Sequence, residues 1–292
     1  MKNLYIVHSP RSGSTVTYLA LLSVTGAVFL PNALGEQHAP NFGVFLQRNL
    51  PRIKYDGNLS NHFGKTQGEW SPSEGSAVFS FFFGGSHPSE ARSRHFREGL
   101  GERFREQLRV VRDLRTPLIT KNAWNSFRLQ AIKAVDPNSN FLWVKRDIFS
   151  AAASELRSRH DHGSLNRWSS ATPANYKELS LQRPALQALE QHVAFSIAIQ
   201  SQLEAFAPRR QLTLQYEELV EKPVEVLRAV CSHFGIKFVS EDKSLLHHIC
   251  APQPAVEAVN DEELSEELRF LEGLRGRASR FGPHEWPHNT NL

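Results

Sequence analysis

The sequence is poor in cysteine and has no long hydrophobic run, and each scarcity excludes a class of protein. Only two cysteines occur in 292 residues, Cys231 and Cys250, and their spacing fits neither a C-x-x-C redox motif nor a zinc finger. We expect both to be buried thiols. The apolar stretches of residues 1–30 are interrupted from Arg11 to Ser14, well short of the roughly 18–20 apolar residues that a membrane span needs.

Features of a secreted protein and a strong excess of charge are also missing. The apolar run Leu4–Val7 is short, and no small-residue cleavage site follows a continuous hydrophobic region, so a cytoplasmic location is expected. The formal charge is only +4 and the pI is about 9.1. This mild excess suits an anionic ligand, and we predict neither a nucleic-acid partner nor a membrane span.

Repeated strand-then-helix patterns run along the chain. Leu4–Val7 is expected to be a strand, followed by a Ser/Pro/Gly loop and a helix over Thr15–Val24. Further strands are expected at 117–120, 141–144 and 212–216, and further helices at 125–135, 148–159 and 223–234. This alternation predicts one α/β domain over residues 1–292, with three α/β/α layers and a mainly parallel sheet.

Less regular insertions interrupt that pattern at 31–115 and 160–183. Apolar residues from Phe96 to Val111 recur at helical spacing, which predicts an amphipathic helix over 90–115 whose eight arginines form a solvated, salt-bridged face. Residues 31–95 hold one apolar run, Val78–Phe83, and predict no definite element. We expect both insertions to shape a substrate pocket.

The loop between the first strand and helix has the composition of an anion site. It comprises Ser9, Pro10, Arg11, Ser12, Gly13, Ser14 and Thr15. Backbone N–H groups at a helix N-terminus point toward a bound anion, and glycine lets the backbone approach it closely. The hydroxyls add donors and Arg11 adds a forked cation. The simpler alternative is a serine-capped helix with Arg11 in solvent.

A nucleoside triphosphatase would place its phosphate loop at the same point, but its motif is missing. G-x-x-x-x-G-K-[ST] requires a lysine after the last glycine, and Ser14 follows Gly13 here. The strand at 141–144 leads into Lys145-Arg146 rather than directly to a magnesium-binding aspartate. Both differences argue against a nucleoside triphosphatase. An ATP-dependent phosphotransferase is kept as an alternative function, as is a non-catalytic nucleotide-binding protein.

Two motifs together resemble the PAPS-dependent sulfotransferase family, where PAPS is 3′-phosphoadenosine 5′-phosphosulfate. Pro10–Thr15 is similar to its P-R-S-G-[ST]-[ST] loop, and Arg146 followed by Ser154 is similar to its arginine and serine eight residues apart. Weaker similarity includes Tyr216–Leu219 and the segment around Trp168, so that the resemblance touches most of residues 3–240. It implies a P-loop-like fold, a PAPS co-substrate and a 3′-phosphate site at Arg146 and Ser154.

PAPS carries phosphate groups at two places on one ribose and therefore needs two anion holes. The carboxyl ends of neighbouring parallel strands can supply them. Arg146 could hold the 3′-phosphate by two hydrogen bonds, while Arg11 neutralises charge on the leaving oxygen. This chemistry requires no metal. The histidine pairs His160-x-His162 and His247-His248 have no third ligand at a convincing spacing.

An acceptor hydroxyl needs a base, and Glu74 is the first candidate. Its loop, Trp70–Gly75, resembles an S-P-x-E segment of bacterial relatives in which histidine often replaces Ser73. His8 is the second candidate, although a histidine ending a buried strand is more often structural. The resemblance includes a K-[NS] pair at Lys121, which could contact a sulfuryl oxygen. The implied acceptor is a hydroxyl of a carbohydrate, a lipid or a small molecule.

Two more arginines lie close to the second motif. Arg157 and Arg159 follow Ser154 by about one helical turn. We expect them to be salt-bridged surface residues rather than ligands.

Overall fold

A parallel four-stranded sheet forms the centre of the molecule. The computed structural model describes residues 3–53, 55, 61–62, 65–84, 95–168, 170–239, 246 and 261–278. The sheet order is β4-β1-β5-β6, and every neighbouring pair is parallel. Its strands are β1 (Leu4–His8), β4 (Ile119–Lys121), β5 (Asn140–Lys145) and β6 (Gln211–Gln215). The predicted α/β fold with a mainly parallel sheet is confirmed.

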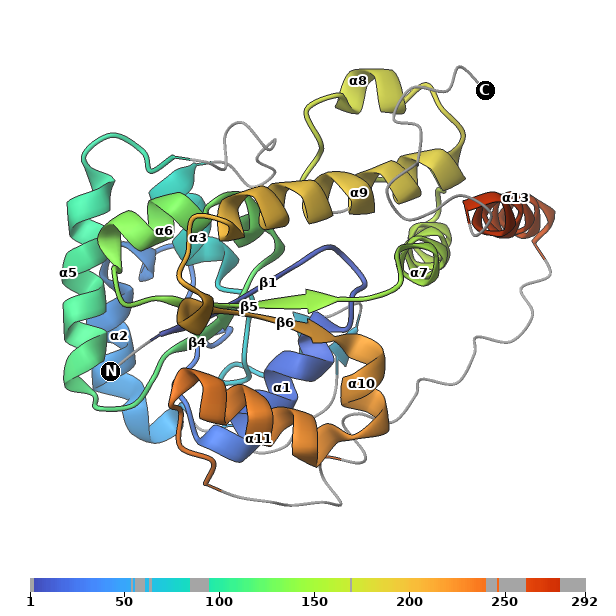
Figure 1. The fold of residues 1–292 in the computed structure, drawn as a ribbon. Helices are drawn as coiled ribbons and strands as arrows, with labels where there is room; N and C mark the ends of the chain where they lie inside the picture. The colour runs from blue at the N-terminus through green and yellow to red at the C-terminus, as the bar shows by residue number, and fades with distance from the viewer. Residues whose placement is uncertain are drawn as a thin grey trace.

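Helices cover both faces of the sheet (Figure 1). One face carries α1 (Ser14–Thr25), α10 (Tyr216–Glu221) and α11 (Pro223–Phe234), and the other carries α6 (Leu129–Val135) and α9 (Pro184–Leu203). Beyond β5 lie α7 (Ile148–Asp161) and, beside it, α13 (Glu262–Ala278). β1, β4 and nearly all of β5 are buried, as expected where both faces of a parallel sheet are covered, whereas in the edge strand β6 only Leu214 is buried.

The two predicted insertions contain short elements. The first holds α2 (Phe42–Asn49), β2 (Asn61–His62), β3 (Lys65–Thr66), α3 (Ser76–Phe83), α5 (Leu100–Asp113) and the 3-10 turns η1 (Ala39–Asn41) and η2 (Leu50–Arg52). The second holds α8 (Tyr176–Leu179). Two further 3-10 turns are η3 (Ala123–Phe127) and η4 (Pro208–Arg210). The apolar run Val78–Phe83 is thus helical.

Three predicted elements differ from the observed ones. The helix expected over 90–115 begins at Leu100, because Gly99 has φ 74° and stops the helical path; residues 90–94 lie outside the described ranges. The helix expected over 125–135 is divided into η3 and α6 at Arg128. Tyr216 begins α10 rather than ending a strand. The solvated arginine face is partly confirmed, since Arg105 and Arg109 pair with Glu102.

Other expectations concern the thiols and the membrane. Cys231 is a buried free thiol whose pKa is raised to about 11 by burial, whereas Cys250 lies outside the described residues. Within the described ranges, none of the helices has the length and hydropathy that crossing a membrane requires. The cytoplasmic location and the single domain stay predictions.

Candidate active site

The loop between β1 and α1 is shaped by two residues with positive φ. Arg11 has φ 58° and Gly13 has φ 83°. A Cβ added to Gly13 would lie 2.0 Å from Cδ2 of Tyr216, so the ring lies directly on the loop backbone. Position 13 therefore requires glycine for two reasons, the left-handed backbone and the lack of room for a side chain.

Donors gather at the start of α1. The first intrahelical bond there runs from the N–H of Thr17 to the carbonyl of Gly13, at 3.0 Å, so the N–H groups just before it have no helical acceptor. The hydroxyl of Ser12 is buried and has no hydrogen-bond partner among the described residues. A buried hydroxyl without a partner is costly, and an anion in the loop would accept its hydrogen bond.

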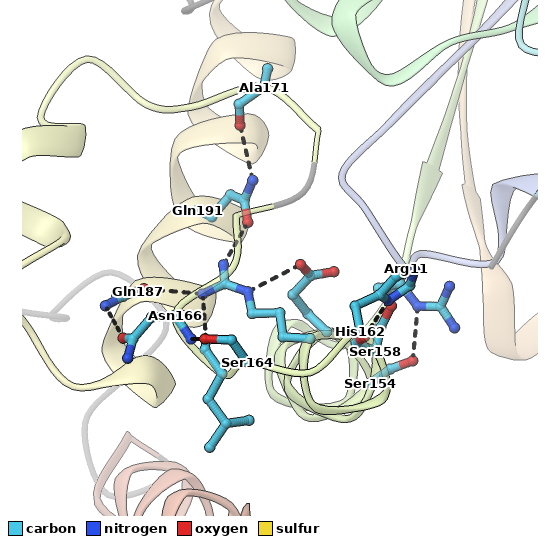
Figure 2. Close-up of polar contacts among 12 residues, drawn as sticks. Arg11, Ser154, Ser158, His162, Ser164, Asn166, Ala171, Gln187 and Gln191 are labelled. Carbon is cyan, nitrogen blue, oxygen red and sulfur yellow. Dashed lines mark hydrogen bonds and ion pairs between the residues drawn. The ribbon is translucent and has the colours of Figure 1, made fainter. Parts of the chain in front are cut away.

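The second motif meets this loop at the carboxyl edge of the sheet. β5 lies next to β1, and Arg146, which follows β5, donates from Nη1 to the carbonyl of Arg11 at 3.0 Å. Arg11 in turn donates from Nε to Oγ of Ser154 at 3.2 Å (Figure 2). Nε of Arg146 is buried without a partner in the described residues. Segments about 140 positions apart in sequence thus form one basic cluster.

Burial makes the cationic form of Arg11 less stable, and a bound anion would offset this cost. Burial lowers the pKa of Arg11, and the charge of Glu155 opposes that shift while the charge of Arg146 adds to it. The charges of Arg11 and Arg146 repel one another, and a bound anion would relieve that repulsion. Asp147 is the N-cap of α7, and its side chain accepts a hydrogen bond from the N–H of Ser150 at 2.9 Å. This cap fixes the start of α7 and therefore the position of Ser154.

Tyr216 is a site residue to which the sequence analysis gave no role. Its ring packs on Gly13 and lies 5.1 Å from the guanidinium of Arg146, measured to the ring centroid. It follows β6, which is the neighbour of β5. Its place at the carboxyl end of a third adjacent strand is the signal that could have identified it.

A second cluster lies beside the loop and contains Lys121 and Glu74. Nζ of Lys121 lies 2.9 Å from Oγ1 of Thr15 and 2.5 Å from Oε1 of Glu74. Asn122 donates to the backbone carbonyl of Glu74 at 3.0 Å. The lysine side chain is 3% exposed and the glutamate 36%, so the carboxylate is the accessible member of the pair. Ser73 holds the turn by donating to the carbonyl of Leu30.

His8 is buried, and it is close enough to Lys121 and Glu74 for their charges to act on it. Its Nδ1 lies 2.8 Å from the carbonyl oxygen of Ser9, which assigns the proton to Nδ1 and leaves Nε2 as an acceptor. Nε2 has no partner among the described residues. Burial, and then the charge of Lys121, lowers the pKa of His8 to about 4, so the imidazole is neutral at pH 7.

The prediction for Arg159 is wrong in one respect. Arg159 is salt-bridged, to Glu155 at 3.2 Å, but both side chains are buried, with 1% and 0% exposure. It faces α9 rather than solvent, because residue 159 lies on the side of α7 that packs against that helix. Arg157 is half-buried.

Of the two histidine pairs, the structure describes only His160 and His162, and these two form no metal site. His160 bonds to Asp261, His162 bonds to the carbonyl of Ser158, and His247-His248 lies outside the described residues. In the described ranges, no three His, Cys, Asp or Glu side chains come together as metal ligands. That the reaction needs no metal stays a prediction.

The family profile described as "Sulfotransferase family" matches residues 3–240, which include the loop after β1 as well as Arg146 and Ser154. The chain belongs to the sulfotransferase family. No curated protein sequence matches it significantly.

Solved sulfotransferases share the fold. Sulfotransferase STF1 of Mycobacterium tuberculosis is 13% identical, with a TM-score of 0.54 over 84% of this chain and 70% of that one. STF9 of Mycobacterium avium is also 13% identical, with a TM-score of 0.54 over 96% and 76%. At this identity the likeness shows the fold alone, and it confirms the predicted P-loop-like α/β arrangement of this sulfotransferase.

Proposed function

We propose that this sulfotransferase moves the sulfuryl group of PAPS to a hydroxyl of a carbohydrate, lipid or small-molecule acceptor. The observation that carries the proposal is the contact of Arg11 with both Arg146 and Ser154. This contact brings together the segments that follow the adjacent strands β1 and β5, and a nucleotide with 5′- and 3′-phosphate groups needs two anion-binding elements.

The roles of the basic residues follow from their places. Ser12, Ser14, Thr15 and the amides at the start of α1 would hold the 5′-phosphosulfate, with Arg11 against the oxygen that leaves. Arg146 and Ser154 would hold the 3′-phosphate, and Arg146 has an Nε donor to offer. Lys121, which contacts Thr15, would bind a sulfuryl oxygen.

Glu74 is the better placed of the two candidate bases. Its carboxylate is partly exposed, so that an acceptor hydroxyl can reach it, whereas His8 is 3% exposed. The base accepts the hydroxyl proton as the acceptor oxygen bonds to sulfur and the bond from sulfur to the nucleotide phosphate breaks. His8 is the second candidate.

Ligand-induced thermal stabilisation tests the nucleotide. Adenosine 3′,5′-bisphosphate (PAP), the product of PAPS, should raise the Tm without magnesium, and ATP should raise it far less. Equal stabilisation by both ligands, lost when magnesium is removed, would instead support the ATP-dependent phosphotransferase.

Transfer of labelled sulfate from PAPS to a panel of sugars, lipid alcohols and phenols tests the activity. Arg11→Ala should abolish both transfer and PAP binding, whereas Glu74→Gln should lower transfer and retain PAP binding. PAP binding without transfer to any acceptor would indicate a non-catalytic nucleotide-binding protein.

A further inference from the structure

The ammonium group of Lys121 lies between the phosphate loop and the candidate base. Its Nζ is 2.9 Å from Oγ1 of Thr15, which belongs to the loop, and 2.5 Å from Oε1 of Glu74. Lys121 ends β4, which pairs with β1, and its side chain is only 3% exposed. A buried cation needs acceptors or a counter-charge, and this one has them on two different segments. One ammonium group thus joins the nucleotide side of the site to the base.

The backbone around Glu74 is held in place, whereas its carboxylate reaches solvent. Ser73 donates to the carbonyl of Leu30 twice, from its N–H at 2.7 Å and from Oγ at 2.8 Å. Asn122 donates to the backbone carbonyl of Glu74 at 3.0 Å. The glutamate side chain is 36% exposed. The carboxylate can therefore turn away from Lys121 while the loop that carries it keeps its path.

A phosphosulfate group in the loop would compete with Glu74 for this ammonium. The amides at the start of α1 and the hydroxyl of Thr15 would hold the phosphosulfate, so that its sulfuryl oxygens would lie within reach of Nζ of Lys121. A sulfuryl oxygen and the carboxylate both carry negative charge, and like charges that share one site destabilise each other. Lysine has a flexible stem and rotatable donors, so it can follow the ligand. Of the two anions, the carboxylate is the one that can turn into solvent.

We propose that Lys121 gates the base: it holds Glu74 in the free protein and contacts a sulfuryl oxygen once PAPS occupies the loop, which releases Glu74 to accept a proton. This inference rests on the proposed function. A carboxylate that is bound to a cation accepts a proton less readily than one that is not. After the release, the acceptor hydroxyl gives its proton to Glu74 as its oxygen bonds to sulfur, and the electron pair of the broken sulfur–oxygen bond leaves with PAP. The base thus acts only when the sulfuryl donor is bound.

Two nucleotides that differ by the sulfuryl group test this exchange. The affinities for PAPS and PAP are measured by calorimetry without any acceptor. Glu74→Gln removes the competing charge, so PAPS should bind about tenfold more tightly than to the wild type, while PAP affinity changes by less than about twofold. Lys121→Met removes the contact with the sulfuryl group, so PAPS should bind about tenfold more weakly, with PAP affinity again unchanged within about twofold. Glu69→Gln, an exposed carboxylate in the same region, is the matched control and should bind both nucleotides as the wild type does.

The double variant Lys121→Met/Glu74→Gln distinguishes the exchange of partners from simple repulsion. If Glu74 acts through the lysine, its replacement should alter PAPS affinity by less than about twofold once Lys121 is absent. An equal rise of PAPS affinity with and without Lys121 would mean that the carboxylate repels the sulfuryl group directly, and it would overturn the gate. Should Lys121→Met fail to fold, Lys121→Gln removes the same charge and retains a donor for Thr15.

The outcomes separate the gate from the proposed function. Unchanged or weaker binding of PAPS to Glu74→Gln, with PAP bound as in the wild type, means that Lys121 contacts both anions at once and overturns the gate alone. Equal losses of affinity for PAPS and PAP also overturn it, since a general structural role would have that effect. A wild-type protein that binds neither nucleotide overturns the proposed function and the inference with it.

Discussion

Two ion pairs of this sulfotransferase differ in burial. Glu155 and Arg159 are enclosed, with 0% and 1% side-chain exposure, and Arg159 has further acceptors around it. Lys121 is equally buried at 3%, but its partner Glu74 is 36% exposed. Both pairs lie near the candidate active site, and only the second can be reached from solvent.

The difference indicates different tasks. A buried pair whose arginine donates to several acceptors within a low-dielectric interior holds its surroundings in one arrangement, and it is costly to break. A pair with an exposed carboxylate can exchange partners when a substrate arrives. We therefore expect substitutions in the Glu155–Arg159 pair to change stability and substitutions in the Lys121–Glu74 pair to change rate.

The largest expected effect is on the buried pair. Arg159→Met leaves Glu155 buried without its cation and should lower the free energy of unfolding by about 3–5 kcal/mol, measured by urea denaturation. The double variant Glu155→Leu/Arg159→Met removes both charges and should recover a large part of that loss. A loss of less than about 1 kcal/mol in the single variant would show that this pair contributes no more to stability than a surface ion pair does.

The rate effect is expected at the accessible pair. Glu74→Gln keeps the shape but removes the proton acceptor, and it should lower sulfate transfer by about 10²–10⁴-fold. The free energy of unfolding should change by less than about 1 kcal/mol, because the side chain is partly solvated. Glu69→Gln, an exposed carboxylate in the same region, is the control. Wild-type transfer by Glu74→Gln would direct the search for the base to His8.

A third prediction concerns buried histidines on the two sides of the site. Burial lowers the pKa of His8 to about 4 and that of His192, which lies near Arg159, to about 3. The unfolded chain binds these protons near pH 6.5, before the folded chain does, so stability must fall as the pH falls below that value. Each histidine should lower the free energy of unfolding by about 2 kcal/mol between pH 7 and pH 5.

Denaturation curves at the two pH values check this. His192→Leu should reduce the loss of unfolding free energy between the two pH values by the contribution of one histidine. An equal loss in the variant and the wild type would contradict the lowered pKa of His192. His160 acts in the opposite sense, because its hydrogen bond with Asp261 raises its pKa, so its contribution is lost as the pH rises.

The sequence predicted those parts of the fold that depend on local patterns. Strand β1 follows from its apolar run, and α11, with proline at its start and Gly235 after its end, follows from periodicity and from helix start and stop residues. The break at Arg128 could not be predicted. Arg128 packs 4.3 Å from the ring centroid of Phe83, a residue distant in sequence, and a local pattern does not reveal such a contact. Tertiary packing overrides helix propensity there.

For the candidate site, the motifs predicted the residues but not their partners. The composition of the loop indicated Arg11, and the resemblance to the sulfotransferase family indicated Arg146 and Ser154. Parallel strand order explains why the three residues meet. The pairing of Lys121 with Glu74 was not predicted, because Glu74 lies in an insertion whose path depends on contacts such as the bridge between Pro31 and Pro72. The burial of Arg159 likewise depends on α9, which follows it by more than 20 residues.

The smallest effect on stability is expected at a third ion pair, in which both side chains are exposed. Arg275 of α13 pairs with Asp147 at 3.2 Å, and their side chains are 45% and 38% exposed. Arg275→Gln retains the length of the side chain and leaves Asp147 to cap α7, so the free energy of unfolding should change by less than about 1 kcal/mol, and less still at high salt. PAP affinity should not change, because the helix cap that places Ser154 is intact. A loss comparable to that of Arg159→Met would show that burial does not rank these pairs, and that α13 holds α7 through Asp147.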